Sequence, residues 1–410
     1  MSGGPDAVLD EVWRREWGRL LALLVAQYRR LELAEDGLAD AFEAAARTWP
    51  AAGLPDNPPA WLLTAARRRV LDRLRAEAVA ARRLPLLAVE AELQQRAQRV
   101  VADDGEPVVD ERLRLVLLCA SPRLAPEAAA ALTLRLVLGL STEDIARLFL
   151  VSTPTMAARL TRARRRLAGE PFSVPSAAEL PARLTVVADV AYLAFTAGYA
   201  PTSGSEVVRP ELAAEAIRLL RLVRELVPPR SPGTDDLDAR LALMLLQHAR
   251  RDARVLDGRL VLLPDQDRSR WHVAEAAEAL QLLLPQVHAP ARPALLEALI
   301  AAEHTVARTA ADTDWARIAA RYAELEALTG SPVVTLNRAV AVAEADGPLA
   351  GLALLAGLDL PGHRLPAVRA ELLVRAGRTD EAHAAYTDAL SRCRNDAERD
   401  HLERRRAELD

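Results

Sequence analysis

One stretch constrains the fold of this chain more than any other. Residues 124–167 read LAPEAAAALTLRLVLGLSTEDIARLFLVSTPTMAARLTRARRRL. They predict an apolar helix, a short helix over 143–149, a turn at 150–152 and a third helix that ends in arginines. Apolar residues recur at helical spacing on both short helices, so these helices can share a small core. The residues concerned are Ile145, Ala146, Phe149, Val151, Met156 and Leu160. The pattern is typical of a helix-turn-helix.

The third helix of this stretch has a uniformly basic solvent face. Residues 152–168 contain five arginines and no acidic residue. Ser152 is a candidate N-cap, and Pro154 falls in the first turn, where a missing amide proton costs least. The arginines alone could be an ordinary solvated face, but within this motif they favour contact with DNA phosphates and the major groove. The residues predicted to contact an upstream DNA element are Ser152, Thr153, Thr155, Arg159, Arg162, Arg164 and Arg165.

The composition favours an all-α fold. The 410 residues are rich in Ala, Leu and Arg, and only 4% of them are aromatic. β-Strands are enriched in β-branched and aromatic residues, and aromatic residues are scarce in this chain, so the composition does not favour strands. A chain of this length holds roughly two to four domains.

Several classes of site and location are excluded by the sequence patterns. Cys119 and Cys393 lie far apart, and the seven histidines show no CxxC or HExxH spacing, so we expect no metal and no cofactor. We find no Gly-rich phosphate loop and no nucleophile elbow, so we expect no catalytic residue and no enzyme. The start lacks a leader pattern, and no uncharged apolar run approaches about 18 residues. These features predict a cytoplasmic protein without a membrane partner.

The first 80 residues predict three helices around a proline-rich loop. Helices over 8–30 and 34–49 are amphipathic, and the second has an acidic outward face. The loop at 50–59 contains four prolines and one glycine, so we expect it to be non-helical. A third helix begins near Ala60.

The order of these blocks resembles the extracytoplasmic-function type of bacterial RNA polymerase sigma factor, within the sigma-70 family. The blocks are AED…DAFEAAARTW, the Pro/Asn loop, NPPAWLLTAARRRVLDRLR and the helix-turn-helix, and they cover residues 8–168. In that family the first blocks form region 2 and the last forms region 4. The resemblance implies that the chain binds the clamp and flap regions of core RNA polymerase and recognises promoter DNA.

The resemblance also implies which residues make these contacts. The residues implied to dock on the polymerase are Asp36, Asp40, Phe42 and Glu43. The residues implied to meet the minus-ten element are Asp56, Asn57, Arg67, Arg68, Asp72 and Arg75. One departure from the family is Leu150, where many relatives have a glycine in the helix-turn-helix.

The last 240 residues or so exceed what a minimal sigma factor needs. Residues 367–390 predict two helices around a turn at Gly377 and resemble a tetratricopeptide repeat, with a weaker copy at 334–355. A branch of the sigma group has a fused, TPR-like C-terminal extension, and this chain resembles that branch. The loops at 194–206 and 262–272 are either capped turns or a contact surface for a regulatory protein or ligand.

We therefore predict a sigma region 2 domain (1–83), a linker (84–112), a region 4 helix-turn-helix domain (113–170) and a C-terminal helical TPR-like extension (171–410). The leading hypothesis is a sigma factor that helps melt the minus-ten element and is regulated by its own C-terminal domain. The alternative is a one-component helix-turn-helix regulator with a repeat sensor domain. A third hypothesis is a repeat scaffold whose front half is vestigial. Residues 34–75 discriminate between the first two, because a simple regulator has no use for them.

Overall fold

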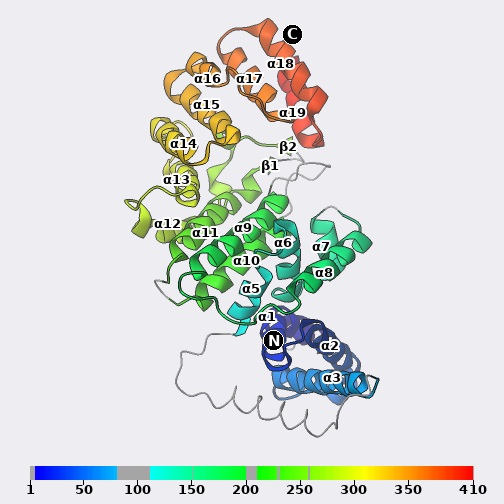
Figure 1. Ribbon diagram of the computed structural model, residues 1–410. Helices are drawn as coiled ribbons and strands as arrows, with labels where there is room; N and C mark the ends of the chain where they lie inside the picture. The colour runs from blue at the N-terminus through cyan, green and yellow to red at the C-terminus, as the bar shows by residue number, and fades with distance from the viewer. Residues whose placement is uncertain are drawn as a thin grey trace. The chain divides into compact units, whose positions relative to one another are not determined.

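The computed structural model describes residues 5–80, 111–149, 151–199, 210–228, 231–256 and 259–409 (Figure 1). The regular structure in these ranges is helical, which confirms the predicted all-α fold, apart from one short antiparallel pair. This pair joins β1 (Val255–Leu256) to β2 (Arg259–Leu260). Leu150, residues 200–206 and the predicted linker up to residue 110 lie outside the described residues. Among the described residues, no helix combines the length and apolarity needed to cross a membrane.

The chain divides into two compact units. The first comprises Met1–Leu193 and Leu219–Thr234, and the second comprises Ala194–Arg218 and Asp235–Asp410. The first unit thus extends past residue 170, where we predicted the helix-turn-helix domain to end. Arg183 shows why, because its Nη1 donates a hydrogen bond of 3.2 Å to the carbonyl oxygen of Leu117.

The described part of the first unit is helical. Its helices are α1 (Pro5–Tyr28), α2 (Leu31–Ala52), α3 (Pro58–Ala80), α5 (Glu111–Cys119), α6 (Pro126–Leu136), α7 (Thr142–Leu148) and α8 (Thr153–Leu167), with parts of α9 (Leu180–Tyr199) and α10 (Pro210–Leu226).

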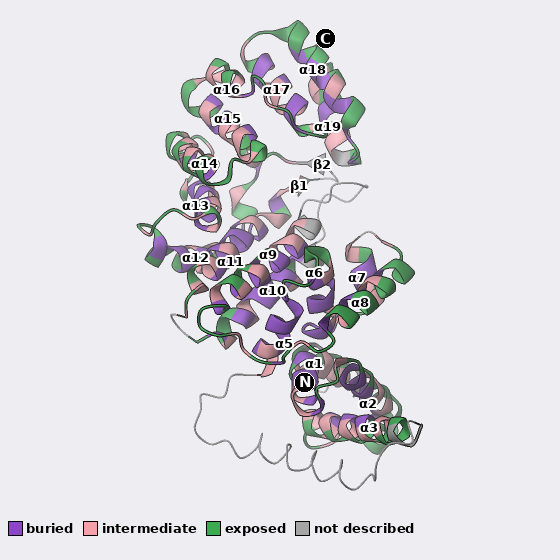
Figure 2. Ribbon diagram, in the orientation of Figure 1, coloured by how far each residue is buried: buried purple, intermediate pink, exposed green. Residues whose placement is uncertain are grey.

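Helices α1, α2 and α3 form a bundle around an aromatic and aliphatic core, visible as the buried stripe of each helix in Figure 2. Trp13 stacks on Trp17 with ring centroids 4.3 Å apart, and Phe42 of α2 meets both rings. Trp49 packs edge to face on Trp61, which ties the end of α2 to the start of α3. Since the apolar stripe of α2 is used in this core, Asp36, Asp40 and Glu43 are left on the outer face, whereas Glu35 is buried.

The end of α2 corrects one sequence-based expectation. We predicted that residues 50–59 are non-helical, but α2 continues through Pro50 to Ala52. Proline is tolerated here because it lies in the last turn, where little helix remains to be disrupted. Gly53, with φ +85°, ends the helix, and its N–H donates to the carbonyl oxygen of Trp49. The non-helical part of the loop is therefore only 53–57.

Two glycines allow α1 to lie directly against the turn after α6. A Cβ atom on Gly18 would come within 2.3 Å of the carbonyl oxygen of Val137, so only glycine fits there. Gly139 adopts φ +75°, and its carbonyl oxygen accepts a hydrogen bond of 2.9 Å from Nε1 of Trp13. The three-helix bundle and the helices around the helix-turn-helix are thus packed into one unit.

The second unit consists of a helical succession. Its elements include α11 (Thr234–His248), η1 (Arg251–Ala253), η2 (Leu263–Asp265), η3 (Arg268–Arg270), α12 (Val273–Leu283), η4 (Leu284–Gln286), α13 (Pro293–Val306), α14 (Trp315–Thr329), α15 (Pro332–Asp346), α16 (Pro348–Leu354), α17 (Arg364–Arg375), α18 (Thr379–Arg392) and α19 (Asp396–Ala407). From α13 onward each helix packs against the next one in the chain. Successive apolar clusters run through them, as in helical-repeat proteins. The predicted turn at Gly377 lies between α17 and α18 and has φ +73°.

The segment 262–272 is held by local caps and by contacts within the second unit. Asp267 accepts hydrogen bonds from the backbone N–H and the hydroxyl of Ser269. Arg268 donates to the carbonyl oxygens of His304 and Ala307 and lies over the ring of Trp271 at 4.5 Å. These contacts are those of a capped turn between helices.

We expect the second unit to lose stability in acid through Glu371. Its carboxylate accepts hydrogen bonds from Arg405 and from the hydroxyl of Tyr386. Burial alone would raise the pKa of Glu371, but these hydrogen bonds outweigh burial and hold the pKa below its usual value. The stabilisation is therefore present above the ordinary glutamate pKa and is lost as the pH falls through the lower folded value.

Glu371→Gln should lower the free energy of unfolding at neutral pH by about 1 kcal/mol, since the side chain is partly exposed and screened. It should also flatten the loss of stability in acid. Urea denaturation at neutral and acidic pH measures both effects. Glu381→Gln is the matched control, because the one described residue that pairs with Glu381 is its exposed neighbour Arg378. An unchanged acid profile in Glu371→Gln would contradict the assignment.

Candidate nucleic-acid interface

The two short helices of the helix-turn-helix are both started by serine caps. Oγ of Ser141 accepts a hydrogen bond of 3.0 Å from the N–H of Asp144 at the start of α7. Oγ of Ser152 accepts one of 3.3 Å from the N–H of Thr155 at the start of α8. The predicted N-cap at Ser152 is therefore in place, and the first turn of α8 presents Thr153 and Thr155 to solvent.

The apolar sides of α7 and α8 form a small core, as the sequence predicts, except that Phe149 and Val151 are only half-buried. Its buried members are Ile145, Ala146, Met156, Leu160, Ala163 and Leu167. The N–H of Val151 donates to the carbonyl oxygen of Ala146, which holds the turn between the helices. Because this core fixes the rotation of α8, the residues between its apolar positions must face outward.

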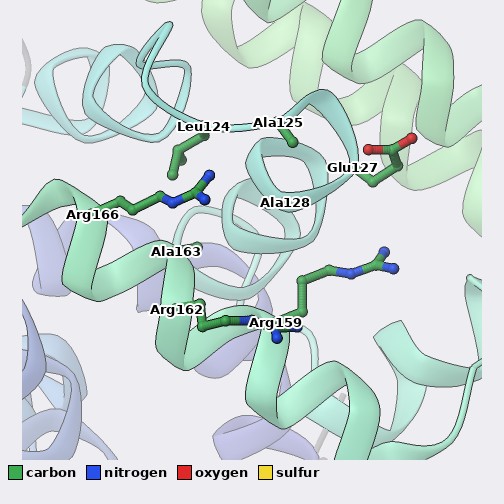
Figure 3. A pocket seen from close by; sticks show the side chains of 8 residues that line it. All are labelled: Leu124, Ala125, Glu127, Ala128, Arg159, Arg162, Ala163 and Arg166. Atoms are coloured by element: carbon green, nitrogen blue, oxygen red, sulfur yellow. The ribbon is translucent and has the colours of Figure 1, made fainter.

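The outward side of α8 and the first turn of α6 line a shallow hollow of about 270 Å³. Figure 3 shows Arg159, Arg162 and Arg166 around it, together with Leu124, Ala125, Glu127 and Ala128 at the start of α6. None of these three arginines makes an ion pair with another described residue. Three guanidinium groups beside the N-terminus of a helix form a surface that attracts phosphate. Arg166 was not among our predicted contacts, although it stands in the same arginine run.

Arg164 was predicted to contact DNA, but its side chain is largely buried and pairs with Glu35, so it is removed from the candidate DNA contacts. Its guanidinium donates hydrogen bonds of 2.7 and 3.1 Å to Oε2 of Glu35, and only 16% of its side chain is exposed. Arg135 of α6 donates to Oε1 of the same carboxylate at 2.8 Å. Glu35 is 5% exposed, so the three charges form a buried triad between α2, α6 and α8. Arg164 therefore holds the unit together instead of facing DNA.

Cys119 lies close to this triad. Burial, reinforced by the charge of Glu35, raises the pKa of the Cys119 thiol to about 12. The thiol therefore stays protonated at neutral pH and is packed in the core.

The predicted polymerase-docking residues are spread over two sides of α2. Asp36, Asp40 and Glu43 lie on the outer face, but Phe42 is 3% exposed and packs in the core, so it cannot offer a contact. Arg73 of α3, which we did not predict, bonds to both Asp36 and Asp40 at 3.1 and 2.8 Å. The two salt bridges to Arg73 hold these carboxylates in place, one turn apart on α2.

The predicted minus-ten residues lie on the loop before α3 and on α3 itself. Asp56 and Asn57 are exposed, and Oδ1 of Asn57 accepts a hydrogen bond of 3.1 Å from the N–H of Ala60. Asn57 therefore also caps α3. Further along, Arg68, Asp72 and Arg75 are exposed, and Arg67 is half-buried. Asp72 and Arg75 pair with each other.

Ser152 offers a prediction that separates helix stability from DNA contact. Ser152→Ala removes the acceptor for the Thr155 N–H, so we expect a loss of about 1 kcal/mol in the free energy of unfolding. Ser152→Asp keeps an acceptor and should retain stability, but its charge faces phosphate and should weaken duplex binding. Thermal denaturation and fluorescence anisotropy with duplex DNA measure the two effects. Equal DNA affinity of Ser152→Asp and wild type would place the start of α8 away from DNA.

Comparisons with known proteins match two stretches of this chain to family models. Residues 114–167, which include α6, α7 and α8, match the model of sigma-70 region 4. Residues 183–286 match a family of unknown function, DUF6596. No solved structure matches the chain. Over 390 residues the chain is 39% identical to R00370, an uncharacterized protein of Rhizobium meliloti (strain 1021), and the match covers 92% of this chain and 90% of that protein. The chain therefore belongs to the same family as R00370 and carries a sigma-70 region 4 followed by a DUF6596 domain.

Proposed function

We propose that this protein is a sigma factor of the extracytoplasmic-function type. It binds core RNA polymerase, recognises an upstream promoter element with α8, and helps melt the minus-ten element through the loop before α3. The observation that carries the proposal is the basic outer face of α8 within a sigma-70 region 4. Arg159, Arg162 and Arg166 have no ion-pair partner among the described residues, so they are free to bind phosphate.

The three-helix bundle at the start of the chain supports the polymerase-binding part of the proposal. A helix-turn-helix needs no such bundle to bind DNA, yet α2 presents Asp36, Asp40 and Glu43 on one exposed face. An acidic helix face favours docking on a basic surface of a partner protein. In this proposal that partner is the polymerase clamp, and region 4 binds the flap.

We further propose that the C-terminal helices regulate the sigma regions. The succession from α13 to α19 has the packing of helical-repeat proteins, which use such surfaces to bind proteins or ligands. The TPR-like extension is then the part of the chain that responds to a signal.

Charge reversal on α2 tests the polymerase contact. Glu43→Arg should weaken binding to purified core polymerase by roughly tenfold or more, because it places a positive charge on the docking face. Surface plasmon resonance with the full chain measures the affinity. Glu11→Arg is a close control, because the exposed pair Glu11–Arg15 has the same i,i+4 spacing as Glu43–Arg47. If wild-type protein shows no affinity for core polymerase while it binds specific duplex DNA, the chain is a one-component regulator instead.

A further inference from the structure

We infer that the C-terminal helices bind one Zn²⁺ ion through His363, Cys393 and Glu398. Nothing in the sequence spacing indicates this site, because the three residues follow no ligand motif. The fold brings them together: His363 precedes α17, Cys393 follows α18, and Glu398 lies in the first turn of α19. Their ligand atoms all lie within 4.8 Å of one another, the one such grouping of three potential metal ligands found in the described part of the chain.

The three side chains provide the donor set that Zn²⁺ prefers. A thiolate, an imidazole and a carboxylate are its common protein ligands. With a neutral His363, the deprotonated Cys393 and Glu398 carry two negative charges, which one Zn²⁺ ion neutralises. The thiol proton is released to solvent when the sulfur–metal bond forms. Hard cations such as Mg²⁺ and Ca²⁺ prefer all-oxygen sites, so this set selects against them.

The spacing of the ligand atoms is close to what a tetrahedral ion requires. Bonds of about 2.0–2.3 Å to zinc place neighbouring ligand atoms about 3.3–3.8 Å apart. Nε2 of His363 and Oε2 of Glu398 are already 2.9 Å apart. These two atoms need to move apart by about 0.4 Å or more, and the distances to Sγ of Cys393 need to close by about 1.5 Å or less, which side-chain rotations achieve without moving the helices.

The burial of the three ligands also fits a metal site. Cys393 is 2% exposed, whereas His363 and Glu398 are partly exposed. The only hydrogen bond of the Cys393 thiol to a described residue is one of 3.4 Å to the carbonyl oxygen of Asn395, and a thiol is a weak donor. The site thus has a protected soft ligand inside and a path to solvent on the other side. With three protein ligands, a fourth position remains for water or a small molecule.

The position of the site predicts what the metal does. It would join the start of α17, the end of α18 and the first turn of α19 with coordinate bonds. A ligand that binds only the folded state raises stability by mass action. We therefore expect zinc to hold the final helices of the second unit in place.

Equilibrium dialysis of the full-length protein with ⁶⁵Zn²⁺, after chelator treatment, tests the inference. We expect one ion per chain in the wild type and a loss of at least tenfold in affinity in Cys393→Ser. The chain contains only one other cysteine, so Cys119→Ser is the matched control and should bind as the wild type does. Far-UV circular dichroism establishes that each variant is folded.

Two further measurements keep the inference testable if Cys393→Ser fails to fold. His363→Gln and Glu398→Gln change partly exposed side chains, and each should weaken zinc binding at least tenfold. Co²⁺ loading should produce a thiolate-to-cobalt charge-transfer band in the wild type and in Cys119→Ser. Absence of stoichiometric binding by the wild type, or full binding by His363→Gln and Glu398→Gln, would overturn the inference. Neither result depends on whether the chain binds polymerase.

Discussion

Replacing Glu35 with alanine is expected to lower the free energy of unfolding of the first unit by about 3–5 kcal/mol. The substitution leaves Arg135 and Arg164 with no carboxylate between them, although both side chains are largely buried. An uncompensated buried charge is costly, because the interior cannot replace the water that the ion has lost. The loss should appear in chemical denaturation followed by tryptophan fluorescence, since Trp17 lies next to Arg135.

Two other variants establish the reason for this loss. Glu32→Ala removes an exposed glutamate one turn earlier on α2 and should change stability by no more than about 0.5 kcal/mol. Glu35→Gln keeps the shape but not the charge, so its effect should lie between those of the other two. If Glu35→Ala were as stable as Glu32→Ala, the buried triad would not hold α2 against α6 and α8.

The second large effect is expected on DNA binding. The triple variant Arg159→Ala, Arg162→Ala, Arg166→Ala should bind duplex promoter DNA roughly a hundredfold more weakly at low salt. The logarithm of the binding constant falls linearly with the logarithm of the salt concentration, and each lost phosphate contact should make this slope shallower by about one unit. The triple variant should therefore have a slope that is shallower by about three units. Fluorescence anisotropy titrations at several salt concentrations measure both quantities.

A triple variant of equal charge provides the control. Arg15, Arg19 and Arg47 are exposed on α1 and α2, and each is paired with a glutamate of its own helix. Replacing these three with alanine changes the net charge by the same amount but should leave the salt slope intact. A similar loss in both triple variants would mean that net charge, and not the face of α8, governs DNA binding.

The helix-turn-helix could be predicted from sequence because its determinants are local. Ser152 caps the helix that it precedes, and Met156 and Leu160 show the spacing of a buried stripe. Family resemblance added the partners, since the arginines alone favour an ordinary solvated face. Pro50 was misjudged because a proline near the end of a helix costs much less than one in the middle.

The features that sequence could not predict depend on contacts between distant segments. Arg164 was assigned to DNA because its partner Glu35 lies 129 positions away. Phe42 was assigned to the polymerase through the family resemblance, although its helical spacing with Leu38 and Ala45 placed it on the apolar side of α2, where Trp13 and Trp17 cover it. His363 and Cys393 looked unrelated until the turns around α17 and α18 brought them together. Only the packed helices show these partners.

In-vitro transcription with purified core polymerase tests the central claim most directly. The full-length protein is added to core polymerase on a pool of genomic fragments, and the start sites are mapped by sequencing the transcripts. We predict initiation at defined sites by the wild type and by the control variant Arg15→Ala, Arg19→Ala, Arg47→Ala, and its loss in the triple variant of α8. Specific binding to duplex DNA without any initiation by the wild type would contradict the account and favour a one-component regulator.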